Sequence, residues 1–167
     1  MHKVNCIDLF KTEIVNIPFR HFLSTSVLKR GIEKKLFDWF EKTDQWGFTE
    51  TDFYTQYEFG ILQCQLPFEL QCLVDTETVE NICDKLKQVY NITAFDLVGV
   101  TAHKLINEHK IGVHNDYLEH EETHRLVIQI NPNWDSVKRR FFNAIQFIRC
   151  GRCFKNSYAH KQYCFWI

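Results

Sequence analysis

The sequence lacks a long hydrophobic run, an excess of charge of one sign and a paired pattern of cysteines. The first residues, Met1–Cys6, contain no unbroken apolar core of a secretory signal, and no later run approaches membrane-spanning length. The formal net charge of -1 gives no reason to expect a nucleic-acid or anionic-membrane partner. Seven scattered cysteines, an odd number, suit a reducing compartment better than a disulfide framework. We therefore expect a cytoplasmic protein that binds neither nucleic acid nor membrane.

The sequence does contain enough apolar material for a packed core. The 167 residues are 45% hydrophobic and 15% aromatic. This length fits one domain under the usual range of about 100–200 residues. The composition is that of a globular chain and not of a disordered one.

The first half of the chain predicts a strand, a helix and a loop. Glu13–Phe19 is typical of a strand that Pro18 closes. Ser24 or Ser26 is expected to cap a helix that runs to about Lys42. Its apolar positions recur every four residues, which predicts a helix packed on a sheet: Leu28, Ile32, Leu36 and Phe40. Thr43–Thr51 is expected to be a surface loop, followed by a strand or an aromatic-rich loop.

The second half predicts another helix and further strands. A helix is expected from about Glu77 to Tyr90, capped by Asp75 or Thr76. Phe95–Ile106 is expected to be extended, and Thr123–Ile130 is rich in β-branched and apolar residues, which favours a strand. His103 and His109 have no carboxylate two residues later, so we interpret them as ordinary strand and turn histidines.

One short motif suggests metal chemistry. His114 and Asp116 follow an apolar stretch, and on a strand two such residues share one face while Asn115 points away. An imidazole and a carboxylate placed side by side can supply two ligands of the facial triad that holds Fe(II) and leaves positions open. The alternative is a solvated pair at the end of a strand. Gly112 before the motif and a strand that begins at Arg125 and leads to Asn131 and Trp134 favour the metal site.

In this context, Phe95–Asp135 resembles the iron- and 2-oxoglutarate-dependent dioxygenases, specifically their prolyl-4-hydroxylase-like branch. The resemblance implies a mainly β fold with packed α-helices (α+β), in which a double-stranded β-helix, or jelly roll, follows N-terminal helices. It implies Fe(II), held by His114 and Asp116, with 2-oxoglutarate and O2 as cosubstrates and stimulation by ascorbate. The implied reaction is hydroxylation or oxidative cyclisation at an unactivated C–H bond of a peptide or small-molecule substrate.

Arg125 is a further candidate site residue. A guanidinium near the metal can grip a carboxylate with two parallel hydrogen bonds, which would make Arg125 a contact to 2-oxoglutarate. The alternative is a salt bridge to Glu121 or Glu122 that closes the preceding loop. The resemblance places the usual basic residue for this contact later in the chain, after a distal histidine.

The sequence departs from the family pattern after Asp135, where the family has a Gly-Gly pair and later the distal histidine. Removing one A from the purine run that encodes Lys138 and Arg139 shifts the reading frame. The shifted frame can encode a Gly-Gly pair, a strand-like run, an acidic helix-like stretch and a Pro-x-Asn, in the order of the family. We therefore expect residues 1–137 to be a partial oxygenase domain whose last strands are missing. Residues 138–167 are then expected to be an out-of-frame tail that packs poorly and leaves the enzyme impaired.

Two alternative functions remain open on the sequence. The first is a zinc-binding interaction module, because tetrahedral Zn²⁺ favours four Cys and His ligands and the tail contains Cys150, Cys153, His160 and Cys164. The second is a fragment that keeps part of the oxygenase fold without turnover.

Overall fold

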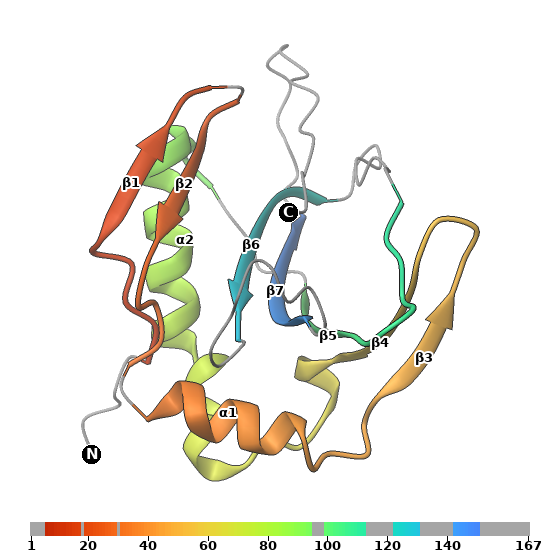
Figure 1. Cartoon of the computed structure of the whole chain (residues 1–167). Coiled ribbons are helices and arrows are strands. Elements are labelled where there is room, and N and C mark those ends of the chain that lie inside the picture. Colours follow the sequence, from red (N-terminus) through yellow and green to blue (C-terminus); the bar gives the residue numbers. More distant parts are fainter. Residues whose placement is uncertain are drawn as a thin grey trace. The chain divides into compact units, whose positions relative to one another are not determined.

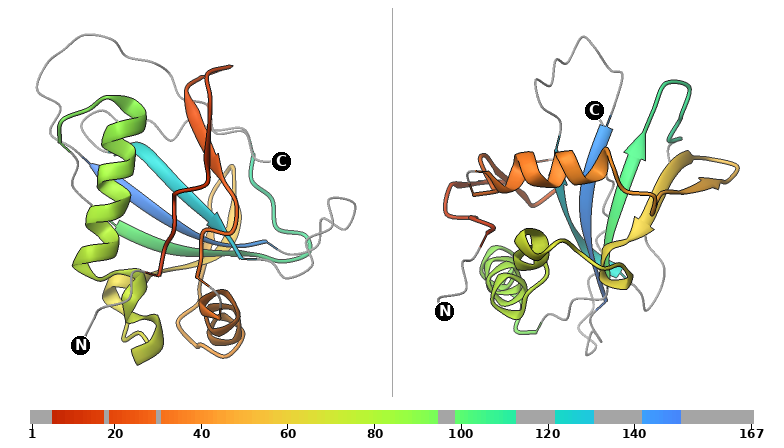
Figure 2. Two further views of the ribbon diagram at one scale, coloured as in Figure 1. Left: turned by 90° about the vertical axis from the view of Figure 1, so that its left-hand side faces the viewer. Right: turned by 90° about the horizontal axis from the view of Figure 1, so that it is seen from below.

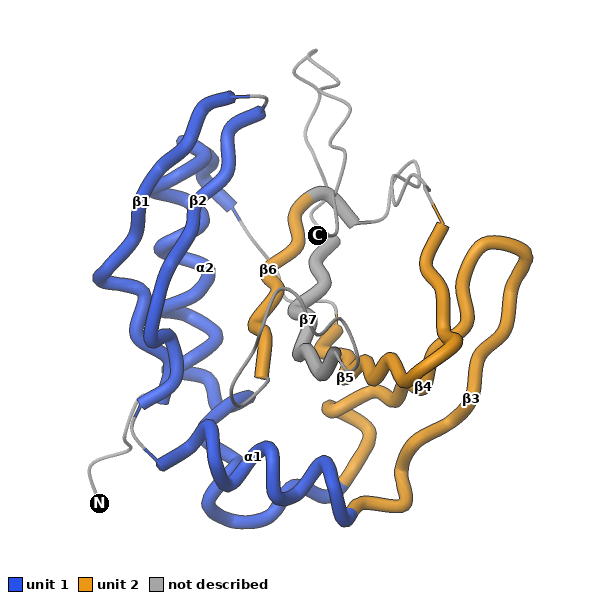
Figure 3. The backbone as a smooth tube through the Cα atoms, viewed as in Figure 1, with its two compact units in different colours: residues 1–42, 65–97 blue, residues 43–64, 98–167 orange. Residues whose placement is uncertain are grey.

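A computed structural model describes residues 6–17, 19–29, 31–94, 99–112, 122–130 and 142–150; residues 122–123 and 142–150 are described by backbone only. The chain divides into two units (Figure 3). The first comprises Met1–Lys42 with Gln65–Leu97, and the second comprises Thr43–Cys64 with Val98–Ile167. The domain boundary predicted at Val137 lies outside the described residues.

The first unit contains a hairpin, two α-helices and a 3-10 helix (Figure 1). Strands β1 (Thr12–Val15) and β2 (His21–Ser24) pair antiparallel. Helices α1 (Ile32–Phe40), η2 (Phe68–Leu73) and α2 (Thr76–Tyr90) follow, and η2 packs against both α-helices. Arg20 ties the hairpin end to α2, since its Nε donates to the carbonyl oxygen of Val89 at 2.7 Å.

Helix α2 is confirmed with its predicted cap. The Asp75 carboxylate accepts a hydrogen bond from the backbone N–H of Thr78 at 2.8 Å, which satisfies a donor that has no partner inside the helix. The helix ends at Asn91, which has φ 54° and adopts the left-handed conformation that asparagine tolerates. Its buried residues recur at helical spacing and face one side: Thr78, Ile82, Cys83, Leu86 and Val89.

Helix α1 begins later than predicted. Residues 21–24 form β2, and Leu28 pairs with Ile7 in an isolated bridge, so neither Ser24 nor Ser26 caps the helix. The chain instead enters α1 through Gly31 at φ 91°, a conformation that glycine adopts without steric cost. The predicted apolar stripe is buried at Leu36 and Phe40. Full burial of such a side chain stabilises a fold by about 1.5–3 kcal/mol.

The second unit is built on one five-stranded antiparallel sheet. Its strands are β3 (Gly47–Glu50), β4 (Thr55–Gly60), β5 (Gly99–Leu105), β6 (Glu122–Gln129) and β7 (Phe142–Cys150). Their order across the sheet is β3-β4-β5-β7-β6, which the right-hand view of Figure 2 shows. The short 3-10 helix η1 (Ile61–Gln63) packs on β5. The predicted strands in Phe95–Ile106 and Thr123–Ile130 are confirmed, whereas the predicted loop Thr43–Thr51 contains strand β3.

Strand β7 lies in the segment that we expected to pack poorly. Its backbone pairs with β5 on one side and with β6 on the other. The expectation concerns the packing of side chains, and the side chains of residues 142–150 lie outside the described part of the structure. A sheet position needs only extended backbone with free donors and acceptors, so this pairing does not report how the side chains of the segment pack. The shifted reading frame can also encode a strand-like run at this place, so this pairing does not distinguish the two frames.

The described residues therefore form a mixed α+β protein with small antiparallel sheets and few helices. This agrees with the α+β part of the predicted fold class. None of the helices in the described part of the chain is long and apolar enough to cross a membrane.

Candidate functional site

The predicted metal ligands His114 and Asp116 lie outside the described residues, but the chain that leads to them is described as far as Gly112. Ile111 forms a bridge with Tyr54, and the N–H of Gly112 donates to the carbonyl oxygen of Phe53 at 2.6 Å. One step earlier, the N–H of Thr55 donates to the carbonyl oxygen of Lys110 at 2.9 Å. The extended segment before the motif is thus fixed to the start of β4.

Gly112 allows this close approach. A Cβ built on this residue would lie 3.1 Å from the carbonyl oxygen of Phe53. A larger residue would therefore require the neighbouring backbone to give by a few tenths of an ångström. The glycine two residues before His114, which the resemblance singled out, has a backbone role in the structure.

The two faces of the sheet differ in chemistry. Successive residues of a strand point to opposite faces, and paired residues on neighbouring strands point to the same face. Val100 and Ala102 of β5 and Leu126 and Ile128 of β6 are buried, which defines the apolar face. Thr101 of β5 and Val127 of β6 lie between these residues; they are half-buried and belong to the opposite face. We call this opposite face the polar face; its members include Thr49, Gln56, Glu58, Thr101, His103 and Arg125.

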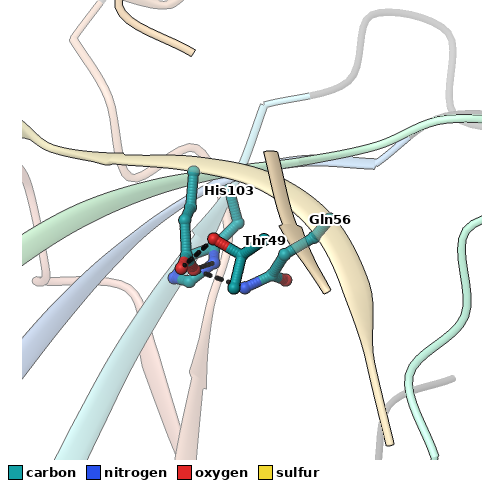
Figure 4. A network of polar contacts seen from close by, with 4 residues as sticks. Thr49, Gln56 and His103 are labelled. Atoms are coloured by element: carbon teal, nitrogen blue, oxygen red, sulfur yellow. Dashed lines mark hydrogen bonds and ion pairs between the residues drawn. The ribbon is translucent and has the colours of Figure 1, made fainter. Parts of the chain in front are cut away.

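A hydrogen-bonded cluster occupies the polar face where β3, β4 and β5 meet (Figure 4). Glu58 is its centre. One carboxylate oxygen accepts from the Thr49 hydroxyl at 2.7 Å, and the other accepts from the Gln56 side-chain amide at 2.6 Å. The Nδ1 atom of His103, the cross-strand neighbour of Glu58, lies 3.6 Å from the second oxygen. We call Thr49, Gln56, Glu58 and His103 the Glu58 cluster.

The Glu58 cluster is partly shielded from water. The side chains of Glu58 and His103 are 27% and 14% exposed, and Gln56 is 7% exposed as a whole residue. The two donors hold the Glu58 carboxylate in one orientation. The distance of 3.6 Å to His103 is too long for a hydrogen bond, so this contact is an ion pair only when the imidazole is protonated.

Tyr54 lies on the same face of β4, two residues before Gln56. Its position is fixed by Thr51, whose hydroxyl accepts from the N–H of Tyr54 at 3.1 Å. Burial, and then the negative charge of Glu58, raise the pKa of the Tyr54 hydroxyl. Because Ile111 pairs with Tyr54, this end of the polar face adjoins the segment that precedes His114.

Arg125 is half-buried on β6 and belongs to the same polar face as the Glu58 cluster. It pairs with Ile148 of β7, whereas His103 pairs with Ala144, so the two are two strands and four residues apart. Ordinary strand spacings put them roughly 15–17 Å from each other. Arg125 therefore belongs to another part of the polar face and not to the Glu58 cluster.

The other predicted ligands are not in the described part of the chain. The side chains of Cys150, Cys153, His160 and Cys164, the zinc alternative, lie outside it. Among the described residues, no group of three or more His, Cys, Asp or Glu side chains converges on a metal position. The donor set predicted for Fe(II), one imidazole and one carboxylate, has the chemistry that this metal accepts, and it leaves a third protein ligand to be supplied.

Sequence reasoning missed the Glu58 cluster. His103 was interpreted as an ordinary strand histidine, and Glu58 was not selected. The only signal in the sequence was the alternation of polar residues in each strand, Gln56 with Glu58 and Thr101 with His103. These residues meet only because of the register in which β4 pairs with β5. In this register Glu58 lies opposite His103, which is 45 residues later in the chain.

Comparisons with known proteins assign no family to this arrangement. No family model matches the chain, and no curated protein matches it at a significant level. The functional interpretation therefore depends on the motif and on the geometry described above.

Proposed function

We propose that the chain is an iron- and 2-oxoglutarate-dependent oxygenase, with His114 and Asp116 as two of the metal ligands. The proposed reaction is hydroxylation or oxidative cyclisation at an unactivated C–H bond of a peptide or small-molecule substrate. In this proposal the antiparallel sheets are part of a double-stranded β-helix. When bound, iron with 2-oxoglutarate and O2 supplies the oxidative chemistry, and ascorbate keeps the iron reduced.

One observation carries the proposal most directly. The backbone from Lys110 to Gly112 is hydrogen-bonded to Phe53–Thr55, so the chain enters the His114-x-Asp116 motif from a fixed position next to the polar face. A metal site requires ligands whose backbone is held in place, and ligands on strands are positioned more accurately than ligands on free loops. The half-buried polar face offers hydrogen-bonding groups for a cosubstrate or substrate beside it.

Arg125 has a secondary part in the proposal. Arg125 is half-buried on the polar face, and we propose that its guanidinium orients a carboxylate, the role that the resemblance makes possible for this residue. The third metal ligand and the main basic contact to 2-oxoglutarate are not assigned in the chain as given. We propose that they are encoded in the shifted frame after Lys138, so that the chain as given is impaired.

The proposal is tested by metal binding. Equilibrium dialysis of the purified chain against Co(II), a stable substitute for Fe(II), should show binding that His114→Ala weakens at least tenfold. His120→Ala, which removes another histidine of the same stretch, is the matched control and should bind like the original chain. Equal Co(II) binding by the His114→Ala variant would contradict the proposal. Zinc retained by the original chain and lost in Cys150→Ser or Cys153→Ser would establish the zinc module instead.

A further inference from the structure

The Glu58 carboxylate is held in a fixed orientation by neutral donors. Thr49 and Gln56 each occupy one of its oxygens with a single hydrogen bond, and neither brings a positive charge. A carboxylate has about four acceptor positions, so acceptor capacity remains on both oxygens. Because the side chain is only 27% exposed, water compensates its charge incompletely.

The neighbouring strands supply no permanent cation to Glu58 in the described part of the chain. Lys104, next to His103 on β5, points to the apolar face, where its Nζ lies 5.5 Å from the centre of the Trp46 ring. The β7 position in register with His103 is Ala144, and its flanking residues are Asn143 and Ile145, none of which is basic. His103 is the only ion-pair partner of Glu58 among the described residues. An imidazole loses its charge within the physiological pH range.

The aromatic side chain of Tyr54 lies on the same face of the sheet. Tyr54 immediately precedes β4, beyond Gln56, and the raised pKa of its hydroxyl has the Glu58 charge as its second cause, after burial. The field of this carboxylate thus extends along the strand toward the segment that leads to His114. An ammonium or guanidinium group is attracted both by a carboxylate and by the face of an aromatic ring.

We propose that Glu58 binds a cationic group of the substrate, the ammonium of a lysine-like side chain or the guanidinium of an arginine-like one, with Tyr54 four residues away on the same face. This inference rests on the proposed oxygenase function, and it adds the chemical class of the substrate, which is cationic. Glu58 is the charged contact, and Thr49 and Gln56 hold it in position. The bound cation lies on the sheet whose strand β4 begins beside the segment that leads to His114.

The test uses binding of small probes, which requires neither iron nor turnover. n-Pentylamine carries a lysine-like ammonium, n-butylguanidine carries an arginine-like guanidinium, and 1-pentanol is the uncharged control of the same length. Each is titrated into the isotopically labelled chain, and the dissociation constant is taken from the NMR shifts of the Gln56 side-chain amide. We expect at least one cationic probe to bind tenfold or more tightly than 1-pentanol. The stronger of the two identifies the group.

The decisive variant is Glu58→Gln, which removes the charge and keeps an oxygen that accepts from Thr49. It should abolish the preference for the cationic probe, and the backbone N–H shifts of β3 and β4 report that the sheet is intact. Glu50→Gln is the matched control, because Glu50 is an exposed glutamate on the neighbouring strand. It should leave the preference unchanged. Equal binding of amine and alcohol by the original chain, or a preference that survives in Glu58→Gln, would overturn the inference.

This experiment and the metal-binding test fail independently. Suppose that Glu58→Gln loses the preference for the cationic probe, but His114→Ala binds Co(II) as well as the original chain. This result would support the cation site and contradict the oxygenase proposal. The opposite combination would retain the oxygenase and remove the cationic substrate.

Discussion

At the scale of single residues, burial changes the acid–base behaviour of Cys6. Its side chain is 1% exposed. Burial, and then a hydrogen bond with Cys72, raise the pKa of the Cys6 thiol well above its usual range. In the unfolded chain the thiol titrates near its ordinary pKa of about 8.5. Between these two values the folded protein keeps a proton that the unfolded chain has released, so stability falls as the pH rises above about 8.5.

We therefore predict that Cys6→Ala makes stability less dependent on alkaline pH. The original chain should lose, through Cys6, up to about 1.4 kcal/mol of unfolding free energy for each pH unit above the ordinary thiol pKa. The variant should lack this contribution, although it is somewhat less stable at neutral pH because a buried atom is removed. Urea unfolding at pH 7.5 and at higher pH measures the difference. An identical pH dependence in the two proteins would show that the Cys6 thiol ionises as readily in the folded state as in the unfolded one.

At the scale of secondary structure, the N-terminal cap of α2 is the contact whose contribution is most easily isolated. Asp75→Ala removes the acceptor of the Thr78 N–H and leaves that donor unpaired at the helix end. We expect a loss of about 1 kcal/mol of unfolding free energy, the usual effect of removing such a cap. Thermal or urea unfolding measures it.

Asp84→Ala is the matched control for the cap. Asp84 is an exposed aspartate of the same helix that forms a surface ion pair with Lys87 at 2.8 Å. Pairs of this kind contribute about 0.3–0.5 kcal/mol, so the control should lose clearly less stability than Asp75→Ala. Equal losses in the two variants would mean that the Asp75 hydrogen bond adds nothing beyond an ordinary surface charge.

The helices also show what the sequence can and cannot predict. Helix α2 was predicted with its cap because local signals agree: Asp75, the spacing of Ile82 and Leu86, and the end near Tyr90. The start of α1 was predicted wrongly, because a serine can resemble a helix cap while the flanking residues prefer to pair as strands. For residues 21–28 the contacts with β1 and with Ile7 decide the outcome.

The strands show the same limit. β5 and β6 were predicted from their β-branched and apolar residues, whereas β3 was missed because Gly47–Glu50 contains only one large apolar side chain. Its pairing with β4 is a tertiary property that overrides local propensity. For the same reason the Glu58 cluster, which three strands assemble, was not predictable from spacing along the chain, although the His114-x-Asp116 motif was visible as a motif.

At the scale of the whole molecule, the proposed activity depends on how the segment after Val137 is encoded. Strand β7 completes the backbone pairing of the sheet. This pairing leaves open which side chains the functional protein carries there. We propose that the shifted reading frame encodes the Gly-Gly pair, the last strands and the third metal ligand. With only His114 and Asp116, the site cannot define the facial triad that orders the cosubstrate before O2 arrives.

The most direct test of the proposed function is succinate formation from 2-oxoglutarate by two chains under the same Fe(II) and ascorbate. One is the chain as given, and the other comes from the same gene with one A removed near the Lys138 codon. We predict that the frame-restored chain forms succinate, that its His114→Ala variant does not, and that the chain as given forms little or none. Equal succinate from the two chains would contradict the frameshift and make His160 the first candidate for the third ligand. Undiminished succinate from the His114→Ala variant would contradict the iron site itself.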